Sequence, residues 1–137
     1  MNKRTLLLLA LIAVAAGAFI GYRMYNEKPA GAGEKKAEVT LTAEELFQAF
    51  TADEVAAGKQ YNDKVVQVSG TIREIAVDPN GPTNVYLETS DMLAAVVCEF
   101  APGSVPAGWK KGDKAVLKGF CAGFNMDVLL QRCSIVE

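Results

Sequence analysis

A run of strand-like segments constrains the fold more than any other feature of this sequence. From Lys64 onward, short apolar or alternating segments are separated by turn sequences, with no long helical pattern between them. Five strands of this size seldom make a stable open sheet, because both edges would be exposed. The sequence therefore predicts a mainly β domain whose strands close into a small barrel. The predicted strands lie at about residues 64–76, 83–90, 93–100, 114–123 and 127–136.

Two glycines interrupt strands that are otherwise well suited to a sheet. Gly70 lies within VVQVSGTI, and Gly119 lies within KAVLKGF. A glycine in a strand loses side-chain packing and costs backbone entropy, so each position needs a structural reason. A small barrel coils its strands strongly, and glycine permits the bend that this requires. Both glycines follow a turn and an Asp-Lys pair, so we predict barrel bends in the first and fourth strands, which would pair.

A helical pattern precedes the strands, over about residues 43–60, with a break near Thr51 as an alternative. Thr42 and Glu45 fit a capping box, and Thr51 and Glu54 repeat it nine residues later. The helix has one apolar edge, which we expect to cover the barrel. The side chains predicted to dock it are Leu46, Phe50, Val55 and Tyr61.

The start of the chain holds an uncharged apolar segment of eighteen residues, Thr5 to Tyr22. A helix in a protein core would show a polar stripe over this length, so the segment predicts lipid surroundings. A retained anchor needs roughly 17–25 apolar residues, and Arg23 and Tyr25 follow as interfacial residues would. The alternative is a cleaved signal peptide, with 16–18 as the small-residue site. We expect the retained anchor, in contact with the membrane through residues 5–22.

Charge and composition divide the chain into three parts. Residues 1–26 form the predicted anchor, residues 27–40 a Gly-, Ala- and Lys-rich flexible linker, and residues 41–137 the folded domain. Residues 1–37 hold six Lys/Arg and two Glu, a net charge of +4. Residues 38–137 hold eight Lys/Arg and fourteen Asp/Glu, a net charge of −6. An acidic domain argues against binding to nucleic-acid backbones, which need a basic footprint.

The absence of histidine is the most informative negative feature. It removes Ser-His-Asp and Cys-His catalysis and the commonest metal ligand. No phosphate-binding loop or dinucleotide fingerprint is present either. The sequence therefore predicts no enzyme, no metal and no cofactor.

Three cysteines remain as candidates for chemistry: Cys98, Cys121 and Cys133. Their spacings of 23 and 12 residues, without a Cys-x-x-Cys pair, do not fit a zinc site. In an oxidising compartment a disulfide could join Cys121 to Cys133 on adjacent predicted strands, or Cys98 to Cys133. Three small buried thiols are the alternative.

Aromatic residues offer one further class of site. Barrels that bind single-stranded nucleic acid stack bases on exposed aromatics in a basic groove. The aromatics in or beside the predicted strands are Tyr86, Phe100, Phe120 and Phe124. Basic residues near them are few (Arg73, Lys118 and Arg132), so we expect nucleic-acid binding to be unlikely here. Trp109 lies in a predicted loop, where it would plug a barrel end or contact a partner.

Four segments together resemble the tRNA_anti-like family of bacterial proteins: ELFQAFTADEVAAGKQYNDKVVQVSGTI, VVCEF, KKGDKAVLKGFCAG and DVLLQRCSIV. The resemblance covers about residues 41–137. It implies an OB-fold, often behind a membrane anchor or lipoprotein signal, and implies little about activity. No cysteine lies near the apolar segment, which excludes a lipid-modified N-terminal cysteine.

A weaker resemblance connects GDKAVLKG, residues 112–119, with the cytochrome c maturation haem chaperone, another anchored OB barrel. That family attaches haem through a histidine, which this chain lacks, so the attachment chemistry does not carry over.

These features combine into one prediction. The fold is a five-stranded OB-fold barrel with an N-terminal covering helix, preceded by a single transmembrane helix. The function is a membrane-anchored, non-enzymatic binding module for a protein or small ligand, with single-stranded nucleic-acid binding as the alternative. The location is the bacterial inner membrane, single-pass, with the barrel in the periplasm or otherwise extracytoplasmic, because a short tail before a first apolar segment usually stays in the cytoplasm. Cleavage and secretion to the periplasm is the alternative.

Overall fold

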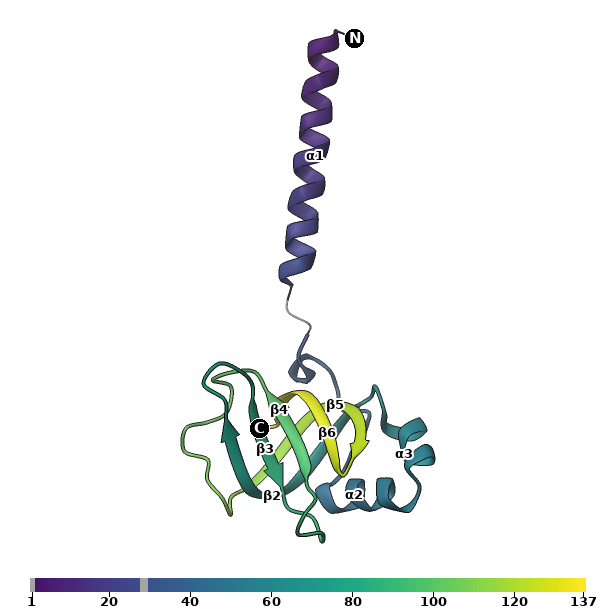
Figure 1. Ribbon diagram of the computed structural model, residues 1–137, viewed down its shortest axis with the longest axis vertical. Coiled ribbons are helices and arrows are strands. Elements are labelled where there is room, and N and C mark those ends of the chain that lie inside the picture. The colour runs from purple at the N-terminus through teal and green to yellow at the C-terminus, as the bar shows by residue number, and fades with distance from the viewer. Residues whose placement is uncertain (1, 28–29) are drawn as a thin grey trace.

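The computed structural model describes residues 2–27 and 30–137 of the chain. The first element is a 24-residue helix, α1 (Lys3–Asn26), which stands clear of the barrel and has no buried residue (Figure 1). Its mean hydropathy reaches 2.3, so by length and composition it could cross a membrane.

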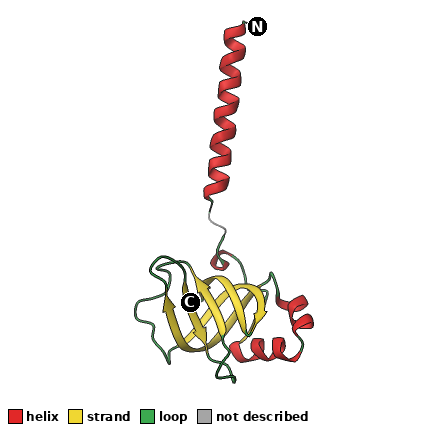
Figure 2. Ribbon diagram, viewed as in Figure 1, coloured by secondary structure: helices red, strands yellow, loops and turns green. Residues whose placement is uncertain are grey.

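The rest of the chain centres on a closed β-barrel (Figure 2). Its strands follow the order β2-β3-β4-β6-β5, and β5 pairs again with β2 to close the ring. All neighbours are antiparallel except β4 and β6, which are parallel. The predicted closed five-stranded barrel is confirmed, as is the pairing of its first and fourth strands. The strands are β2 (Val65–Val77), β3 (Thr83–Leu87), β4 (Val96–Phe100), β5 (Lys114–Asn125) and β6 (Asp127–Ile135).

Strand β2 serves both sides of the barrel. Its residues 65–71 pair with β5, and its residues 72–77 pair with β3, with a register shift between Ile72 and Glu74. Gly70 lies just before this change of partner, within a regular ladder opposite Ala115. The register shift in β2 therefore lies after Gly70 in the chain and not at Gly70 itself.

The two glycines instead share a need for close packing. A Cβ at Gly70 would lie 3.2 Å from the Cβ of Ala43, at the start of the covering helix. A Cβ at Gly119 would lie 2.5 Å from the sulfur of Cys133. Gly119 also lies at a register shift between β5 and β6, as a predicted bend would.

The covering helix is two short helices, α2 (Ala43–Ala52) and α3 (Glu54–Tyr61). Thr42 caps α2 with the predicted capping box. The second capping box was wrong, because Asp53 caps α3 and the Thr51 hydroxyl donates back to the carbonyls of Phe47 and Gln48. Val55 on α3 is 68% exposed, so its predicted docking role was also wrong; the buried residues of α3 are Ala57 and Tyr61.

Part of the predicted flexible linker is ordered against the barrel. A 3-10 turn, η1 (Ala32–Glu34), buries Ala32 completely. It leads into β1 (Val39–Thr42), which pairs in parallel with the first half of β2. A sixth strand thus lies beside the barrel, and Ala32 is the one buried residue among residues 30–40 that precede and begin it.

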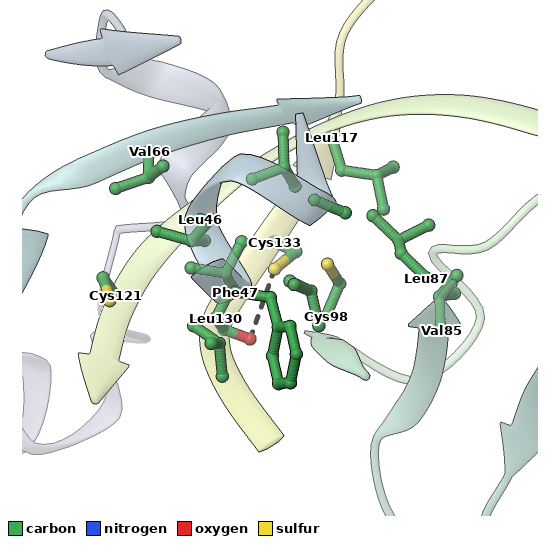
Figure 3. Packing of buried hydrophobic residues seen from close by; sticks show 14 of the residues in the cluster. Leu46, Phe47, Val66, Val85, Leu87, Cys98, Leu117, Cys121, Leu130 and Cys133 are labelled. Carbon is green, nitrogen blue, oxygen red and sulfur yellow. Dashed lines mark hydrogen bonds between the residues drawn. The ribbon is translucent and has the colours of Figure 1, made fainter. Parts of the chain in front are cut away.

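The core fills the barrel and extends under α2 (Figure 3). Leu46, Phe47 and Phe50 point from α2 into it, and Phe100 is buried as the sequence predicted. The largest fully buried side chains on the barrel strands are Phe100, Ile72, Leu87, Leu117 and Leu130.

Candidate ligand-binding surface

An aromatic side chain between positive charges marks the outside of strands β5 and β6. The guanidinium carbon of Arg132 lies 4.0 Å from the centre of the Phe120 ring, and the Lys35 ammonium lies 5.2 Å from it. Both distances suit cation–π attraction. Lys118 joins the group, because its Nζ donates to the Lys35 carbonyl at 2.9 Å. We call Lys35, Lys118, Phe120 and Arg132 the basic aromatic surface.

Three separate segments bring this surface together. Phe120 lies opposite Gln131 in the β5–β6 ladder, which places it beside Arg132. Arg132 has a φ of +52°, a left-handed conformation that a non-glycine residue adopts only where its surroundings hold it. Its Nη1 donates to the Ala30 carbonyl at 3.4 Å. The turn η1, held by buried Ala32, then sets the position of Lys35.

The electrostatics of the surface follow from those partners. Arg132 and Lys118 donate to backbone carbonyls, which orient the head groups but do not cancel their charge. Lys35 and Arg132 are exposed, while Phe120 and Lys118 are half-buried. The surface therefore offers a fixed positive field around one aromatic face, which suits an anionic partner.

A cleft of about 610 Å³ opens beside Arg132. It lies between the turn that precedes β3 (Gly81 and Pro82), the loop after β4, and strand β6. Ligand pockets commonly measure about 300–1,000 Å³ and are largely apolar with a few polar groups. The cleft fits this description, with Arg132 and Glu99 as its charged residues. Its remaining lining residues are Gly31, Phe100, Ala101, Pro102, Ser104, Cys133 and Ser134.

An unpartnered polar atom belongs to the strand that pairs with one wall of this cleft. Asn84 on β3 pairs across the sheet with Glu99, which lines the cleft. The Oδ1 atom of Asn84 is buried and has no hydrogen-bond partner among the described residues. Buried acceptors are nearly always satisfied, so this atom is an exception in the barrel wall. Asn84 is not among the residues that line the cleft.

All three cysteines are buried free thiols. Cys121 lies opposite Leu130 in the β5–β6 ladder, so the structure does not bring it to Cys133. Cys98 and Cys133 lie together in the core (Figure 3), and the neighbouring Cys133 thiol, with burial, raises the pKa of Cys98. Burial also raises the pKa of Cys121. A disulfide stays a prediction, with Cys98 and Cys133 as the pair that the geometry favours.

Trp109 is partly buried and packs against the hydrophobic core. With Ile75, Val77, Thr83 and Val105 it lines a shallow hollow at one end of the barrel. Whether Trp109 plugs a barrel end or contacts a partner stays a prediction. Among the residues that the structure describes, no group of His, Cys, Asp or Glu is placed to hold a metal ion.

Sequence reasoning found parts of this surface but not the whole. Phe120, Lys118 and Arg132 were noted as separate aromatic and basic residues, and Lys35 was assigned to the linker. These four residues come together because η1 folds back on β5 and β6. No local pattern in the sequence predicts that contact. Phe124, the fourth candidate aromatic, packs on Phe50 with ring centres 5.8 Å apart and belongs to the helix contact.

The closed barrel with its preceding helix matches a known family. The tRNA_anti-like family model matches residues 1–135. The chain belongs to the tRNA_anti-like family, as the sequence segments predicted. No curated protein matches the chain.

Solved structures give a likeness of fold. A proposed nucleic acid-binding lipoprotein from Klebsiella pneumoniae subsp. pneumoniae is similar, at 20% identity and a TM-score of 0.52. The match covers 72% of this chain and 92% of that one. At this identity the match shows the OB-type fold alone. The expectation that nucleic acid is an unlikely partner gains no support from it.

Two further structures match more loosely. An OBody bound to hen egg-white lysozyme is 17% identical, with a TM-score of 0.41, and the match covers 57% of this chain and 86% of that one. An aspartyl-tRNA synthetase assigned in Leishmania major Friedlin is 12% identical, with a TM-score of 0.45. That match covers 74% of this chain and 21% of the synthetase chain.

Proposed function

We propose that this protein is a membrane-anchored, non-enzymatic binding module whose OB barrel takes a small ligand or a short segment of a protein. The observation that carries the proposal is the cleft of about 610 Å³ beside Arg132. Its mostly apolar lining, with Arg132 as its cation and Glu99 as its carboxylate, favours a ligand with an apolar body and an anionic group that pairs with Arg132 away from Glu99.

The non-enzymatic part of the proposal rests on the state of the reactive groups. A catalytic thiol needs a lowered pKa and exposure, whereas the pKa values of Cys98 and Cys121 are raised and all three thiols are buried. Glu45 and Asp53 act as helix caps, which accounts for both carboxylates structurally.

The anchor is α1, which we propose crosses the bacterial inner membrane once and leaves the barrel on the extracytoplasmic side. Support comes from the length and hydropathy of α1 and from the exposure of every described residue in it. A cleaved leader would have the same sequence pattern. N-terminal sequencing of the protein recovered from washed membranes distinguishes the two, because only the anchor retains residues 1–26.

Single-stranded nucleic acid is the second candidate ligand. One observation favours it: Phe120 lies with Lys35 and Arg132, and proteins that bind single strands combine aromatic and basic side chains in this way. The ascribed activity of the Klebsiella lipoprotein points the same way. The net charge of −6 on residues 38–137 opposes it, because a long polyanion must approach an acidic domain.

The test compares two probes on the full chain in nanodiscs of neutral lipid, with empty discs as the blank. Naphthoate, an apolar ring with a carboxylate, reports the cleft by calorimetry. A fluorescent single-stranded oligonucleotide at low salt reports the basic aromatic surface by anisotropy. We expect naphthoate to bind and R132Q to weaken it by roughly tenfold, because a charge-assisted bond is lost.

Two variants separate the candidates. Ser104→Trp fills the cleft from its loop side and should abolish naphthoate binding without touching Phe120. Phe120→Ala removes the stacking face and should leave naphthoate binding in place. Salt-sensitive oligonucleotide binding that F120A abolishes, with no naphthoate binding, would replace the first candidate with the second.

A further inference from the structure

We propose that the basic aromatic surface docks on anionic phospholipid headgroups and holds the barrel against the membrane in one orientation. The proposal rests on the anchoring role of α1 given above, and it adds a second, surface contact to that anchor. It assigns Lys35, Lys118, Phe120 and Arg132 to a lipid surface and leaves the cleft beside them for the ligand.

The length of the connection supports this placement. Helix α1 ends at Asn26, and Ala30 follows four residues later. Four residues span at most about 14 Å even when fully extended. The Ala30 carbonyl accepts a hydrogen bond from Arg132, so the basic aromatic surface begins where the connection ends. The end of the membrane segment and this surface are therefore never far apart.

Charge decides which side of the barrel faces the lipid. Residues 38–137 carry a net charge of −6, so most orientations of the barrel are repelled by an anionic bilayer. Four cations (Lys35, Lys36, Lys118 and Arg132) and two carboxylates (Glu34, and Glu99 in the cleft beside Arg132) gather on and beside η1. This local net charge of +2 opposes the charge of the rest of the domain and selects one orientation.

The cations are also held in place for this task. Lys118 and Arg132 are fixed by backbone carbonyls, and Lys35 and Arg132 by the Phe120 ring. Binding a headgroup phosphate would therefore lose little side-chain freedom. Half-buried Phe120 presents an apolar edge at the same level, which suits the boundary between headgroups and acyl chains.

A lipid surface fits these observations better than nucleic acid does. The membrane is always within the reach of the short connection, so the contact forms at high effective concentration. A free polyanion has no such advantage and must overcome the net negative charge of the domain. Nucleic acid at this surface is therefore the competing outcome of the test.

The test is lysine footprinting of the full chain in nanodiscs. One set of discs contains phosphatidylcholine alone, and the other contains about one quarter phosphatidylglycerol. An amine-reactive acylating reagent labels exposed lysines, and peptide mass spectrometry reports the rate at each one. We expect labelling of Lys35 and Lys118 to slow by roughly threefold or more in the anionic discs. Raising the salt to about 0.5 M should remove the protection, because the Debye length falls to roughly 4 Å.

Matched controls come from the same chain. Lys59, Lys110 and Lys111 are exposed elsewhere on the domain, so their labelling should not depend on the lipid. Lys118 should lose its protection in the K35Q/R132Q variant and keep it in K110Q/K111Q, which removes the same charge from a distant loop.

Each other outcome overturns the proposal. Equal labelling of Lys35 and Lys118 in both kinds of disc, with the protein incorporated, would overturn the docking and leave the anchor intact. Protection by a single-stranded oligonucleotide in neutral discs, without protection by anionic lipid, would assign the surface to nucleic acid. Failure of the chain to incorporate into discs would overturn the anchor and the docking together.

Discussion

At the scale of single residues, the two strand glycines differ in what surrounds them. Besides the Cys133 sulfur, a Cβ at Gly119 would meet two more atoms of β6, lying 3.1 Å from the Cβ of Leu130 and 3.2 Å from the carbonyl oxygen of Gln131. Overpacking of this kind typically costs about 1–3 kcal/mol. We expect Gly119→Ala to lower the free energy of unfolding of the barrel by that amount, measured by chemical denaturation of the full chain in detergent.

Gly70 provides the matched control. Its nearest neighbours would lie 3.2 Å and 3.4 Å from a new Cβ, and alanine there also reduces the entropy of the unfolded chain. Gly70→Ala should therefore change stability by less than about 1 kcal/mol. In a C133A background, where the sulfur is absent, the cost of Gly119→Ala should shrink. A cost at Gly70 equal to that at Gly119 would contradict this account of the two positions.

At the scale of elements, the start of α2 depends on one cap. The Thr42 hydroxyl accepts from the Glu45 N–H at 3.1 Å, and the Glu45 carboxylate accepts from the Thr42 N–H at 2.8 Å. Replacing an N-cap threonine with alanine typically costs about 1 kcal/mol. We expect Thr42→Ala to destabilise the barrel by this amount, because α2 supplies Leu46 and Phe50 to the core.

Thr51 is the control for that prediction, since the sequence assigned it the same role. Its hydroxyl donates to helix carbonyls that are already bonded within α2, so Thr51→Ala should cost well under 1 kcal/mol, roughly a few tenths. Asp53→Ala, which removes the observed cap of α3, should resemble Thr42→Ala. Equal costs at Thr51 and Asp53 would show that the cap of α3 is misassigned.

The elements show where prediction from sequence succeeds and where it stops. The strands that build the barrel were predictable, because each carries its own alternation or apolar run and is bounded by turn residues. Strand β1 was missed, since four residues beside a Gly- and Lys-rich segment give too short a pattern, and its pairing with β2 is a long-range contact. Asp53 was missed because the repeated Thr-x-x-Glu pattern fits a capping box equally well in sequence.

At the scale of the whole molecule, the closed barrel was predictable and the binding surface was not. Closure follows from the number of strands and the cost of open edges. The basic aromatic surface instead joins groups that are distant in sequence, with Lys35 and Lys118 separated by 83 positions and Ala30 and Arg132 by 102. These long-range contacts depend on how the segments around the barrel fold back on it. No local sequence pattern encodes that path.

One hydrogen-bonded carboxylate links the helical layer to the barrel and makes stability depend on pH. Glu44 on α2 accepts from the N–H of Ser90, in the loop between β3 and β4, at 2.6 Å. Hydrogen bonds from the Ser90 side chain and backbone lower the pKa of Glu44 below its ordinary value. Because the folded pKa is the lower one, this stabilisation is present above the ordinary carboxyl pKa and is lost as the pH falls through the folded pKa.

We therefore expect Glu44→Gln to lower the melting temperature of the full chain in detergent at neutral pH. The difference from the parent should narrow as the pH falls below about 4, because protonation removes the charge that the variant lacks. Circular dichroism melts of both proteins across this range measure the difference directly. A difference that stays constant with pH would mean that Glu44 contributes through packing alone, and that the link between α2 and the β3–β4 loop does not depend on its charge.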